Sequence, residues 1–454
     1  MSSPQREGKR SVFAKLCENS SLASVAYVLG RMVPPSNRLR KYKNVLLAAY
    51  STNRRPRVVK NNPIIIRIPP ASVCNYKCLF CEIHKDDLLF PDRPANLITL
   101  EDIKNYESFL STAYNLWFYG GSAEPLMNPH LGDIVKYLKL KYGPRISVNT
   151  NAAPLTRRLS DIMVDFGLDY LLVSYHAATK EGYKYLMTGD VERVDRNLEY
   201  LNRRKARRGK QKPIVDLNFA LQKINAAESK AILNKARELK IHAVHVYKYY
   251  GGRNKLQDLE VSFDYDAKAG NRVLDELYAY ARENGVRLHP KKPDYWSKQA
   301  AEVAWDPENY DHNRKCLLPW TRLQFDPVLD EENAHYVSVC NRINLFKIRY
   351  RKCVLASQEH FDKLWNHPVL QYLRATVNGA GANPVCRYCK NYDRPILRNV
   401  DADRYAEVRD QAVIEFFDEF RKQYRYDEIT GLEVLKENPY PDKFFLDRMN
   451  ALPR

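Results

Sequence analysis

Three cysteines lie close together in the segment Cys74-Asn-Tyr-Lys-Cys78-Leu-Phe-Cys81. Thiolates are the ligands of iron–sulfur clusters, and a [4Fe–4S] cluster contains four irons. Three cysteines from one loop would leave one iron without a protein ligand, open to a cofactor or a substrate. A zinc site is the competing interpretation, but structural zinc usually takes four ligands, and His84 is the one further candidate nearby.

A second group of cysteines lies in the C-terminal third of the chain, and consists of Cys316, Cys340, Cys386 and Cys389. Four thiolates are enough to ligate every iron of a second cluster. A zinc ribbon is the alternative for this group. Cys17 and Cys353 remain over, and we interpret both as ordinary buried or half-buried thiols.

Composition limits the class of protein and the class of partner. The chain has 454 residues, which predicts two or three domains. Lys and Arg number 73 against 54 Asp and Glu, a net charge of +19 that favours an anionic partner. Part of this charge lies in residues 203–212, which we interpret as the solvated end of a helix.

The cellular compartment follows from the cysteines and the apolar stretches. No signal peptide opens the chain, and the apolar stretches near 22–33 and 45–50 are too short and interrupted to span a bilayer. Clustered cysteines kept as thiolate ligands fit a reducing compartment. We therefore expect a cytoplasmic protein.

Short apolar runs alternate with amphipathic helical stretches from about residue 61. The predicted strands are 64–68, 116–119, 146–149, 170–174, 215–221 and 243–247, and the predicted helices are 101–113, 131–141, 157–167, 192–207, 227–239 and 267–286. This alternation predicts βα units in a parallel sheet, and six units predict a partial (βα)6 barrel. The active site of such a sheet lies at the carboxyl ends of its strands, which is where the polar motifs fall.

The rest of the chain divides around this α/β core, which we place at residues 61–290. Residues 1–60 are predicted to be a basic helical N-terminal extension, and 291–315 a linker. A small cysteine-rich domain at 316–392 contains a predicted hairpin, 322–325 with 336–339, and a predicted helix at 361–374. A helical C-terminal tail, 393–454, includes a predicted helix at 402–425.

The first cysteine motif, with Phe80 before its last cysteine, resembles the signature of the radical S-adenosylmethionine (SAM) superfamily. The resemblance implies that SAM binds the open iron of the cluster. It also implies reductive cleavage of SAM to methionine and a 5′-deoxyadenosyl radical, which takes a hydrogen atom from a substrate.

Later motifs resemble the SAM-binding positions of that superfamily. The segment Gly120-Gly121-Ser-Ala-Glu124-Pro125 is similar to its Gly-Gly-Glu-Pro loop, with Ala123 where glycine is usual. The segment Thr150-Asn151-Ala152 is similar to its Thr-Asn-Gly segment, again with alanine in place of glycine. By the same resemblance, Phe80 and Ser174 are predicted SAM contacts. Gln222 and Asn225 end the predicted fifth strand and are predicted contacts of the SAM carboxylate or ribose. For each of these polar strand-end residues, capping of the loop is the alternative.

The C-terminal cysteines resemble the SPASM/twitch extension of radical SAM enzymes. The shared features are Cys316-Leu-Leu-Pro-Trp320, the hairpin ending at Cys340, Leu364-Trp365-Asn366, Arg374 and the pair Cys386 and Cys389. Nothing follows Cys389 in the pattern, so the shorter twitch form fits, with one auxiliary [4Fe–4S] cluster. The two resemblances cover roughly residues 61–392.

The substrate is less determined than the chemistry. We expect net oxidation or rearrangement of an anionic small molecule such as a sugar or nucleotide-linked metabolite, with modification of a peptide or protein as the alternative. A second alternative is a non-enzymatic iron–sulfur or zinc protein that binds nucleic acid. The candidate substrate contacts are His176, Tyr247, Lys248 and Tyr249, which lie at or just past predicted strand ends. A tyrosine or histidine at a strand end is more often structural, which is the alternative for each of them.

The expected partners follow from the same interpretation. The resemblance implies an external electron donor such as flavodoxin or ferredoxin. No stable complex with nucleic acid is expected, because no appended RNA-binding module is recognisable. A peripheral membrane contact of the basic N-terminal segment stays open beside its interpretation as a helical cap.

Overall fold

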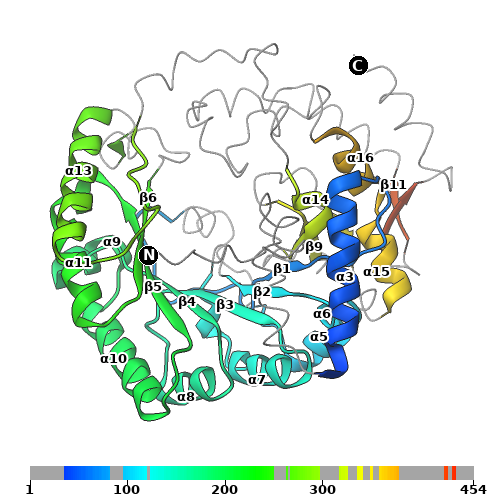
Figure 1. Ribbon diagram of the computed structural model, residues 1–454, viewed down its shortest axis with the longest axis horizontal. Coiled ribbons are helices and arrows are strands. Elements are labelled where there is room, and N and C mark those ends of the chain that lie inside the picture. Colours follow the sequence, from blue (N-terminus) through cyan, green and yellow to red (C-terminus); the bar gives the residue numbers. More distant parts are fainter. Residues whose placement is uncertain are drawn as a thin grey trace, which may run out of the picture.

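The computed structural model describes residues 35–81, 96–119, 123–249, 262–263, 266–296, 316–325, 335–340, 348–350, 357–377, 424–427 and 432–435. Its centre is a curved parallel sheet with helices on its outer side (Figure 1). Seven strands follow one another in chain order: β1 (Ile65–Ile68), β2 (Asn115–Phe118), β3 (Arg145–Thr150), β4 (Tyr170–Ser174), β5 (Ile214–Leu221), β6 (Ala243–Lys248) and β7 (Leu288–His289).

The helices between these strands are the connections expected of βα units. They are α5 (Leu100–Asn105), α6 (Glu107–Leu110), α7 (Leu131–Lys141), α8 (Arg157–Asp165), α9 (Lys180–Met187), α10 (Val191–Arg207), α11 (Ser229–Glu238) and α13 (Ala267–Glu283). Thr156, Thr179 and Asp190 each accept a backbone N–H at the start of α8, α9 and α10. Such caps satisfy donors that have no partner inside the helix, so they define where these helices begin.

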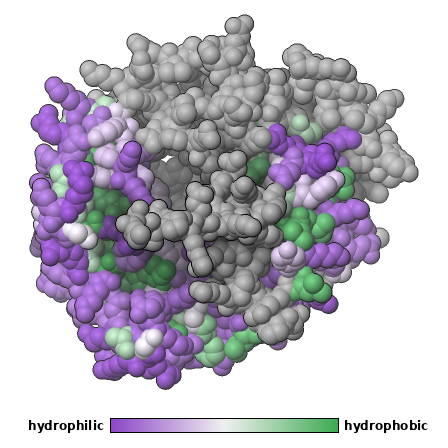
Figure 2. Space-filling view, viewed as in Figure 1, coloured by the Kyte–Doolittle hydropathy of each residue, from purple (hydrophilic) through white to green (hydrophobic). Residues whose placement is uncertain are grey.

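The hydrophobic core lies between the sheet and these helices. Ile66 and Ile68 of β1 are fully buried and alternate with half-buried Ile65 and Arg67, because successive side chains of a strand point to opposite faces. Figure 2 shows that the outer surface over α8, α10, α11 and α13 is largely hydrophilic. One face of the sheet is therefore apolar and covered, while the inner face carries polar side chains.

The sheet continues into the C-terminal region, for which the sequence predicts a separate domain. Strand β8 (Arg322–Phe325) pairs in parallel with β1, so Ile65 lies beside Arg322 and Arg67 beside Gln324. The remaining strands are antiparallel and extend the sheet in the order β9 (His335–Ser338), β10 (Ile348–Tyr350), β12 (Leu432–Leu435) and β11 (Tyr424–Asp427). The predicted hairpin at 322–325 and 336–339 is present as β8 and β9.

The parallel core of the prediction is present, with the strands within one or two residues of their expected bounds. The predicted helix 361–374 is instead two helices, α15 (Gln358–Trp365) and α16 (Pro368–Thr376). Pro368 is the physical reason: proline lacks an N–H and disfavours helical backbone in the residue before it, so it starts a new helix. The predicted helix 101–113 is likewise divided into α5 and α6 at Tyr106.

The described residues nearest the chain ends form one helix and two strands. Helix α3 (Pro35–Arg54) lies within the predicted basic helical N-terminal extension, and Lys41 of this helix donates to the carbonyl of Tyr142. Residues 424–427 and 432–435 form strands, so the C-terminal segment is not wholly helical; residues 402–423 lie outside the described part. None of the helices in the described residues has the length and apolar character that crossing a bilayer requires.

Candidate active site

The first cysteine loop follows β1 and lies at the carboxyl end of the parallel sheet. Backbone hydrogen bonds attach it to the end of α9: the N–H of Leu79 donates to Leu186 O at 2.9 Å, and the N–H of Lys77 donates to Thr188 Oγ1 at 2.7 Å. The N–H of Cys81 donates to Cys78 O at 3.0 Å, which closes a turn within the loop. The path of the loop is thus set by contacts over one hundred residues away in sequence.

Tyr76, in the middle of the first cysteine loop, packs against helix α9 and so helps to position the loop. Its ring packs edge-on against Tyr183 of α9, with 6.2 Å between ring centroids, and it is buried. A Cβ at Gly189 would lie 2.2 Å from Cζ of Tyr76, a separation that atoms do not tolerate. Glycine at 189 therefore makes room for the ring that supports the cysteines.

The three thiols influence one another electrostatically. Burial, followed by the neighbouring Cys81 and Cys74, raises the pKa of Cys78 to about 12. Burial also raises the pKa of Cys74 to about 11, against a hydrogen bond that its sulfur accepts from Tyr76 N at 3.4 Å. Three thiolates cannot coexist here without a compensating positive charge, which a metal centre would supply.

The spacing of the sulfur atoms bears on which centre that is. Among the described residues, these three sulfurs do not form a group in which every ligand atom lies within 4.8 Å of the others. Thiolates around one zinc, at about 2.3 Å from the ion, would be about 3.8 Å apart. Three thiolates are a ligand set that an iron–sulfur cluster takes when one of its irons is left open.

Glu124 follows β2 and lies fully enclosed beside the cysteine loop. Its backbone N–H donates to Val73 O at 2.9 Å, so the residue is attached to the loop directly. Its carboxylate accepts hydrogen bonds from Leu126 N at 2.9 Å, from Asn151 N at 2.7 Å and from the hydroxyl of Thr150 at 2.5 Å. Burial outweighs these bonds and raises the pKa of Glu124 to about 7. A cationic ligand at this carboxylate would restore its charge.

The turn after β3 connects Glu124 to the cysteine loop a second time. Nδ2 of Asn151 donates to Oδ1 of Asn75 at 2.9 Å, and Oδ1 of Asn151 accepts from Ala153 N at 2.9 Å. Ala152 has a φ of +58°, a left-handed conformation that glycine adopts without strain. The substitution noted in the sequence thus keeps the backbone path of a glycine at a steric cost.

The predicted SAM contacts at the ends of β4 and β5 differ in their burial and in their hydrogen bonds. Ser174 ends β4 and lies half-buried beside Asn218 of β5. Gln222, at the end of β5, is fully buried. Asn225 uses its whole amide to hold the turn: it donates to His176 O and to Ala220 O, both at 2.9 Å, and accepts from Gln222 N at 2.8 Å. Its geometry is that of a residue that positions the strand end.

His176, Phe80 and Tyr249 form an aromatic group that joins the cysteine loop to the ends of β4 and β6. The ring of Phe80 lies edge-on to His176 at 5.0 Å and to Tyr249 at 5.8 Å between centroids. Nδ1 of His176 accepts a hydrogen bond from Ala220 N at 3.1 Å, and burial lowers the pKa of His176 to about 4. This histidine is neutral at pH 7 and supports Phe80, which favours the structural interpretation over the catalytic one.

Tyr247 and Lys248 differ in their surroundings. Half of the Tyr247 surface is exposed, whereas Lys248 is buried. Nζ of Lys248 donates to Tyr295 O at 2.8 Å and lies 3.4 Å from Oδ1 of Asp294. Lys248 therefore ties β6 to the segment after β7, and Tyr247 is the more accessible substrate candidate.

The C-terminal motif residues converge on the segment between α3 and β1. Indole N–H groups donate from Trp320 to Pro56 O at 2.9 Å and from Trp365 to Asn61 O at 2.8 Å. The guanidinium of Arg374 donates to Pro319 O, Arg57 O, Trp365 O and Asn366 Oδ1 at 2.8 to 3.2 Å, and it stacks over the ring of Trp365. These hydrogen bonds attach the region that follows Cys316 to the segment between α3 and β1.

The predicted auxiliary ligands lie partly within the described structure. Cys316 precedes the short helix α14 (Leu318–Thr321), and Cys340 is buried just after β9. The remaining predicted site residues, Cys386, Cys389, Gly120 and Gly121, lie outside the described residues. Cys316 and Cys340 thus flank the pair β8 and β9, and β8 pairs directly with β1 in the interior of the sheet.

Two half-buried arginines on the inner face of the sheet, Arg67 and Arg322, were not singled out from the sequence. Arg67 of β1 donates to Gln324 of β8 at 3.4 Å and lies over the rings of Trp117 and Tyr119. Burial and the adjacent Arg322 lower the pKa of Arg67, with Tyr119 and Cys340 acting in the opposite direction. Nε of Arg67 and Nη2 of Arg322 are buried without a hydrogen-bond partner among the described residues. The sequence signal that could have identified Arg67 is an arginine within the apolar run of the first predicted strand.

The basic run at residues 203–212 is engaged within the fold. Arg204 pairs with Asp161 and Asp165 of α8, Arg208 pairs with Asp165, and Lys212 contacts Asp169. Lys210 donates to the carbonyls of Val164 and Asp165. Much of this charge therefore fastens α10 and its following loop to α8, beyond the expected solvated helix end.

Comparisons with known proteins agree with this geometry. The profile of the Radical SAM superfamily matches residues 68–236. The chain is 27% identical over 186 residues to a protein named probable GTP 3′,8-cyclase from Metallosphaera sedula, covering 40% of this chain and 54% of that one. A protein of the same name from Sulfurisphaera tokodaii is 27% identical over 286 residues, which cover 62% of this chain and 77% of that one. The match thus spans about half the length of the first of these relatives.

Solved structures share the fold. The crystal structure of Streptococcus suis SuiB bound to S-adenosylmethionine has a TM-score of 0.51 at 15% identity, covering 78% of this chain and 77% of that one. SuiB bound to precursor peptide SuiA has a TM-score of 0.50 at 14% identity, covering 75% and 73%. At this identity the likeness concerns the fold alone.

Proposed function

Because residues 68–236 form a radical SAM domain, we propose that this chain is an enzyme that cleaves SAM reductively and removes a hydrogen atom from an anionic small molecule. One observation carries the proposal. The three-cysteine loop, the buried Glu124 and the turn at Asn151 are hydrogen-bonded into one unit at the carboxyl end of the parallel sheet.

Each part of this unit has a role in the proposal. Cys74, Cys78 and Cys81 would hold the [4Fe–4S] cluster. A cluster held there would supply the electron for reductive cleavage of the C5′–S bond of SAM, and the 5′-deoxyadenosyl radical so formed would take a hydrogen atom from a substrate C–H bond. Glu124 would accept the ammonium group of SAM, which favours its ionised form because an adjacent cation lowers a carboxyl pKa. Asn225 would keep the end of β5 in place for this binding.

The anionic class of substrate rests on Arg67 and Arg322. Both residues are half-buried, and Nε of Arg67 and Nη2 of Arg322 are buried atoms that lack a hydrogen-bond partner among the described residues. Arginine pairs strongly with phosphate and carboxylate, and a buried N–H without a partner is costly, so an anion bound there would be stabilising. The relatives named probable GTP 3′,8-cyclase make nucleoside triphosphates the first substrates to test.

The auxiliary site extends the proposal to the C-terminal region. Cys316, Cys340, Cys386 and Cys389 would hold a second [4Fe–4S] cluster with every iron ligated. Support comes from Cys316 and Cys340 flanking β8 and β9, beside the strand that carries Arg67. Such a cluster suits the transfer of an electron from the substrate radical, which yields net oxidation, and the electron for SAM cleavage would come from flavodoxin or ferredoxin.

The chemistry is tested by anaerobic reconstitution. We expect about eight irons per chain and dithionite-dependent formation of 5′-deoxyadenosine from SAM. The triple variant Cys74→Ala, Cys78→Ala, Cys81→Ala should lose this product and about half of the iron. Product formation that persists in the triple variant would contradict the proposal. About four irons per chain together with full SAM cleavage would contradict only the proposed auxiliary cluster and would leave the rest of the proposal standing.

The substrate class is tested separately. We expect nucleoside triphosphates to accelerate SAM cleavage and to bind wild-type protein at least about 10-fold more tightly than Arg67→Met, since a charged hydrogen bond contributes about 1.5–3 kcal/mol. Arg203→Met is the control, because Arg203 is exposed and pairs only with Glu199 among the described residues. Equal affinity of Arg67→Met and Arg203→Met for nucleoside triphosphates would contradict a role for Arg67 in binding them. Turnover of a peptide, with no response to nucleotides, would favour the peptide-modifying alternative.

A further inference from the structure

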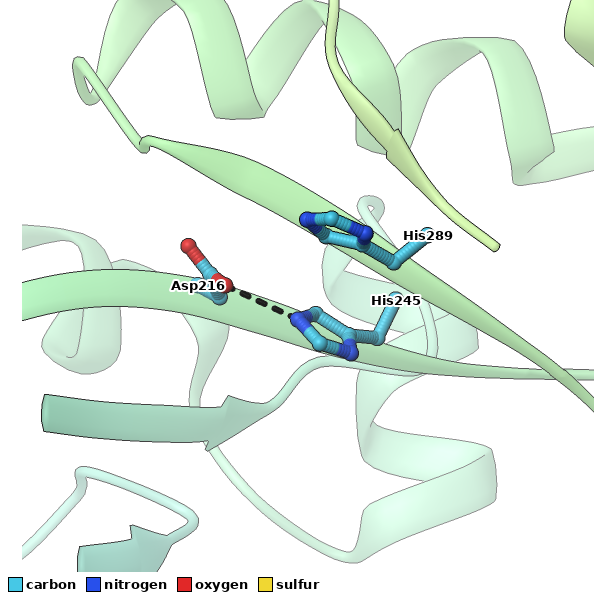
Figure 3. Close-up of side chains that lie close together, drawn as sticks. All are labelled: Asp216, His245 and His289. Atoms are coloured by element: carbon cyan, nitrogen blue, oxygen red, sulfur yellow. Dashed lines mark hydrogen bonds and ion pairs between the residues drawn. The ribbon is translucent and has the colours of Figure 1, made fainter. Parts of the chain in front are cut away.

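A second group of chemically active side chains lies away from the cysteine loop. Asp216 of β5, His245 of β6 and His289 of β7 each offer one ligand atom, and these atoms all lie within 4.8 Å of one another. Oδ2 of Asp216 is 2.8 Å from Nε2 of His245. Figure 3 shows the His289 ring beside that of His245, with the Asp216 carboxylate directed at His245.

We propose that Asp216, His245 and His289 bind a zinc ion. Neutral imidazole nitrogens and a carboxylate oxygen are standard zinc ligands, at about 2.0–2.2 Å from the ion. Tetrahedral ligand atoms at that distance are about 3.4 Å apart. The ligand atoms of Asp216, His245 and His289 lie within 4.8 Å of one another, so binding an ion would require them to move closer together, whereas the cysteine loop has no such compact group among its described residues.

Further polar groups surround the three ligands as supports. Nδ1 of His242 lies 2.9 Å from Oδ1 of Asp216, on the oxygen that does not face His245. The hydroxyl of Tyr170 lies 2.7 Å from Oδ2 of Asp216 and 3.0 Å from Nε2 of His245. Partners of this kind orient metal ligands, and the Tyr170 oxygen or a water can complete the coordination.

The burial of the ligands differs from one side of the group to the other. Asp216 is buried, whereas His245 and His289 are half-buried. An ion can therefore reach the group from solvent on the side of the two imidazoles.

The location indicates what the ion would do. Asp216 and His245 are the third residues of β5 and β6, near the amino ends of these strands, and His289 of β7 pairs with His245, while the cysteine loop follows the carboxyl end of β1. Residues at that end of a parallel barrel serve stability more often than chemistry. Strand β7 has two residues, Leu288 and His289, and pairs only with β6 among the described strands. A zinc ion shared by β5, β6 and β7 would fasten this short edge strand.

The test uses the full chain with its cysteine sites loaded with iron, so that thiolates do not compete for zinc. Metal analysis after dialysis against limiting Zn²⁺ should give about one zinc per chain in wild type and loss of that zinc in His289→Ala. His130→Ala is the control, since His130 is an exposed histidine outside the group. His242→Ala should weaken zinc binding about 10-fold or more without abolishing it, as expected for a supporting partner.

A second readout does not depend on counting metal. Zn²⁺ should raise the melting temperature of wild type and of His130→Ala, and leave that of His289→Ala unchanged. The half-buried His289 is the preferred site of substitution, because its replacement leaves the buried Asp216 in place. Zinc that remains bound in folded His289→Ala, or wild type that neither binds nor responds to zinc, would overturn the proposal and leave a hydrogen-bonded network of Tyr170, Asp216 and the histidines.

Discussion

The backbone N–H of Asn151 donates to Oε2 of Glu124 at 2.7 Å, across 27 residues of sequence. This bond joins the loop after β2 to the turn after β3, and Glu124 is joined in turn to Val73 before the first cysteine. Hydrogen bonds therefore join the ends of three successive strands, and the proposed SAM site includes residues from all three.

Glu124 should make the stability of the cluster-free protein depend on pH. Burial raises the pKa of Glu124 from 4.5 to about 7. Between these values the folded state retains a proton that the unfolded state has released, so the free energy of unfolding falls as pH rises, by up to about 1.4 kcal/mol per pH unit. Urea unfolding across this pH window should show the slope in wild type and a flatter one in Glu124→Gln. Glu101→Gln, which changes an exposed carboxylate paired with Lys104, should keep the wild-type slope; an unchanged slope in Glu124→Gln would refute the assignment.

Ala152→Gly should stabilise the protein. Ala152 has a φ of +58°, which costs an alanine about 1–2 kcal/mol, while the added freedom of glycine in the unfolded chain costs about 0.4–1 kcal/mol. The expected net gain is about 0.5–1 kcal/mol in the free energy of unfolding. Ala153→Gly, at the neighbouring buried alanine, is the matched control and should destabilise. The same loss at both positions would show that the left-handed backbone at 152 carries no strain.

Gly189→Ala should reduce iron incorporation. The new methyl group would meet the Tyr76 ring at 2.2 Å and displace the support of the cysteine loop. Gly209→Ala makes a good comparison, because Gly209 has a φ of +60° and a Cβ there would meet no atom within 4 Å. That change should cost about 1 kcal/mol of stability without affecting the loop. Iron and sulfide per chain, measured after reconstitution of both variants, decide the matter; equal iron content would mean that the loop tolerates movement of Tyr76.

Arg374→Met should destabilise the attachment of the C-terminal region. The guanidinium is buried and donates to three backbone carbonyls and the Asn366 side chain, and these acceptors would be left without their donor. We expect a loss of about 3 kcal/mol or more in the free energy of unfolding, and faster proteolysis within residues 316–377. Lysine cannot reproduce the fork of donors, so Arg374→Lys should recover little of this loss. Arg203→Met, at an exposed arginine, is the control and should change the free energy of unfolding by about 0.5 kcal/mol or less. An equally small effect for Arg374→Met would contradict the conclusion that the hydrogen bonds of Arg374 hold the C-terminal region in place.

The amino-acid sequence by itself determined the parallel core and the motifs at its strand ends. Apolar runs of β-branched residues alternating with amphipathic stretches specify βα units, and connectivity then places Cys74, Glu124 and Asn151 after successive parallel strands. Parallel strands carry their carboxyl ends on one edge, so these residues must gather there.

Only the tertiary structure decided how distant segments meet. The pairing of β8 with β1, the contacts of Arg374 with Arg57 and Pro319, and the meeting of Asp216, His245 and His289 join residues that no local pattern relates. Strand pairing depends on backbone hydrogen bonds that any sequence can make, and a buried ion or arginine is satisfied by whichever groups the packing brings within reach. Periodicity in the sequence therefore predicts the elements and the edge where the chemistry lies, while packing selects the partners of each polar side chain.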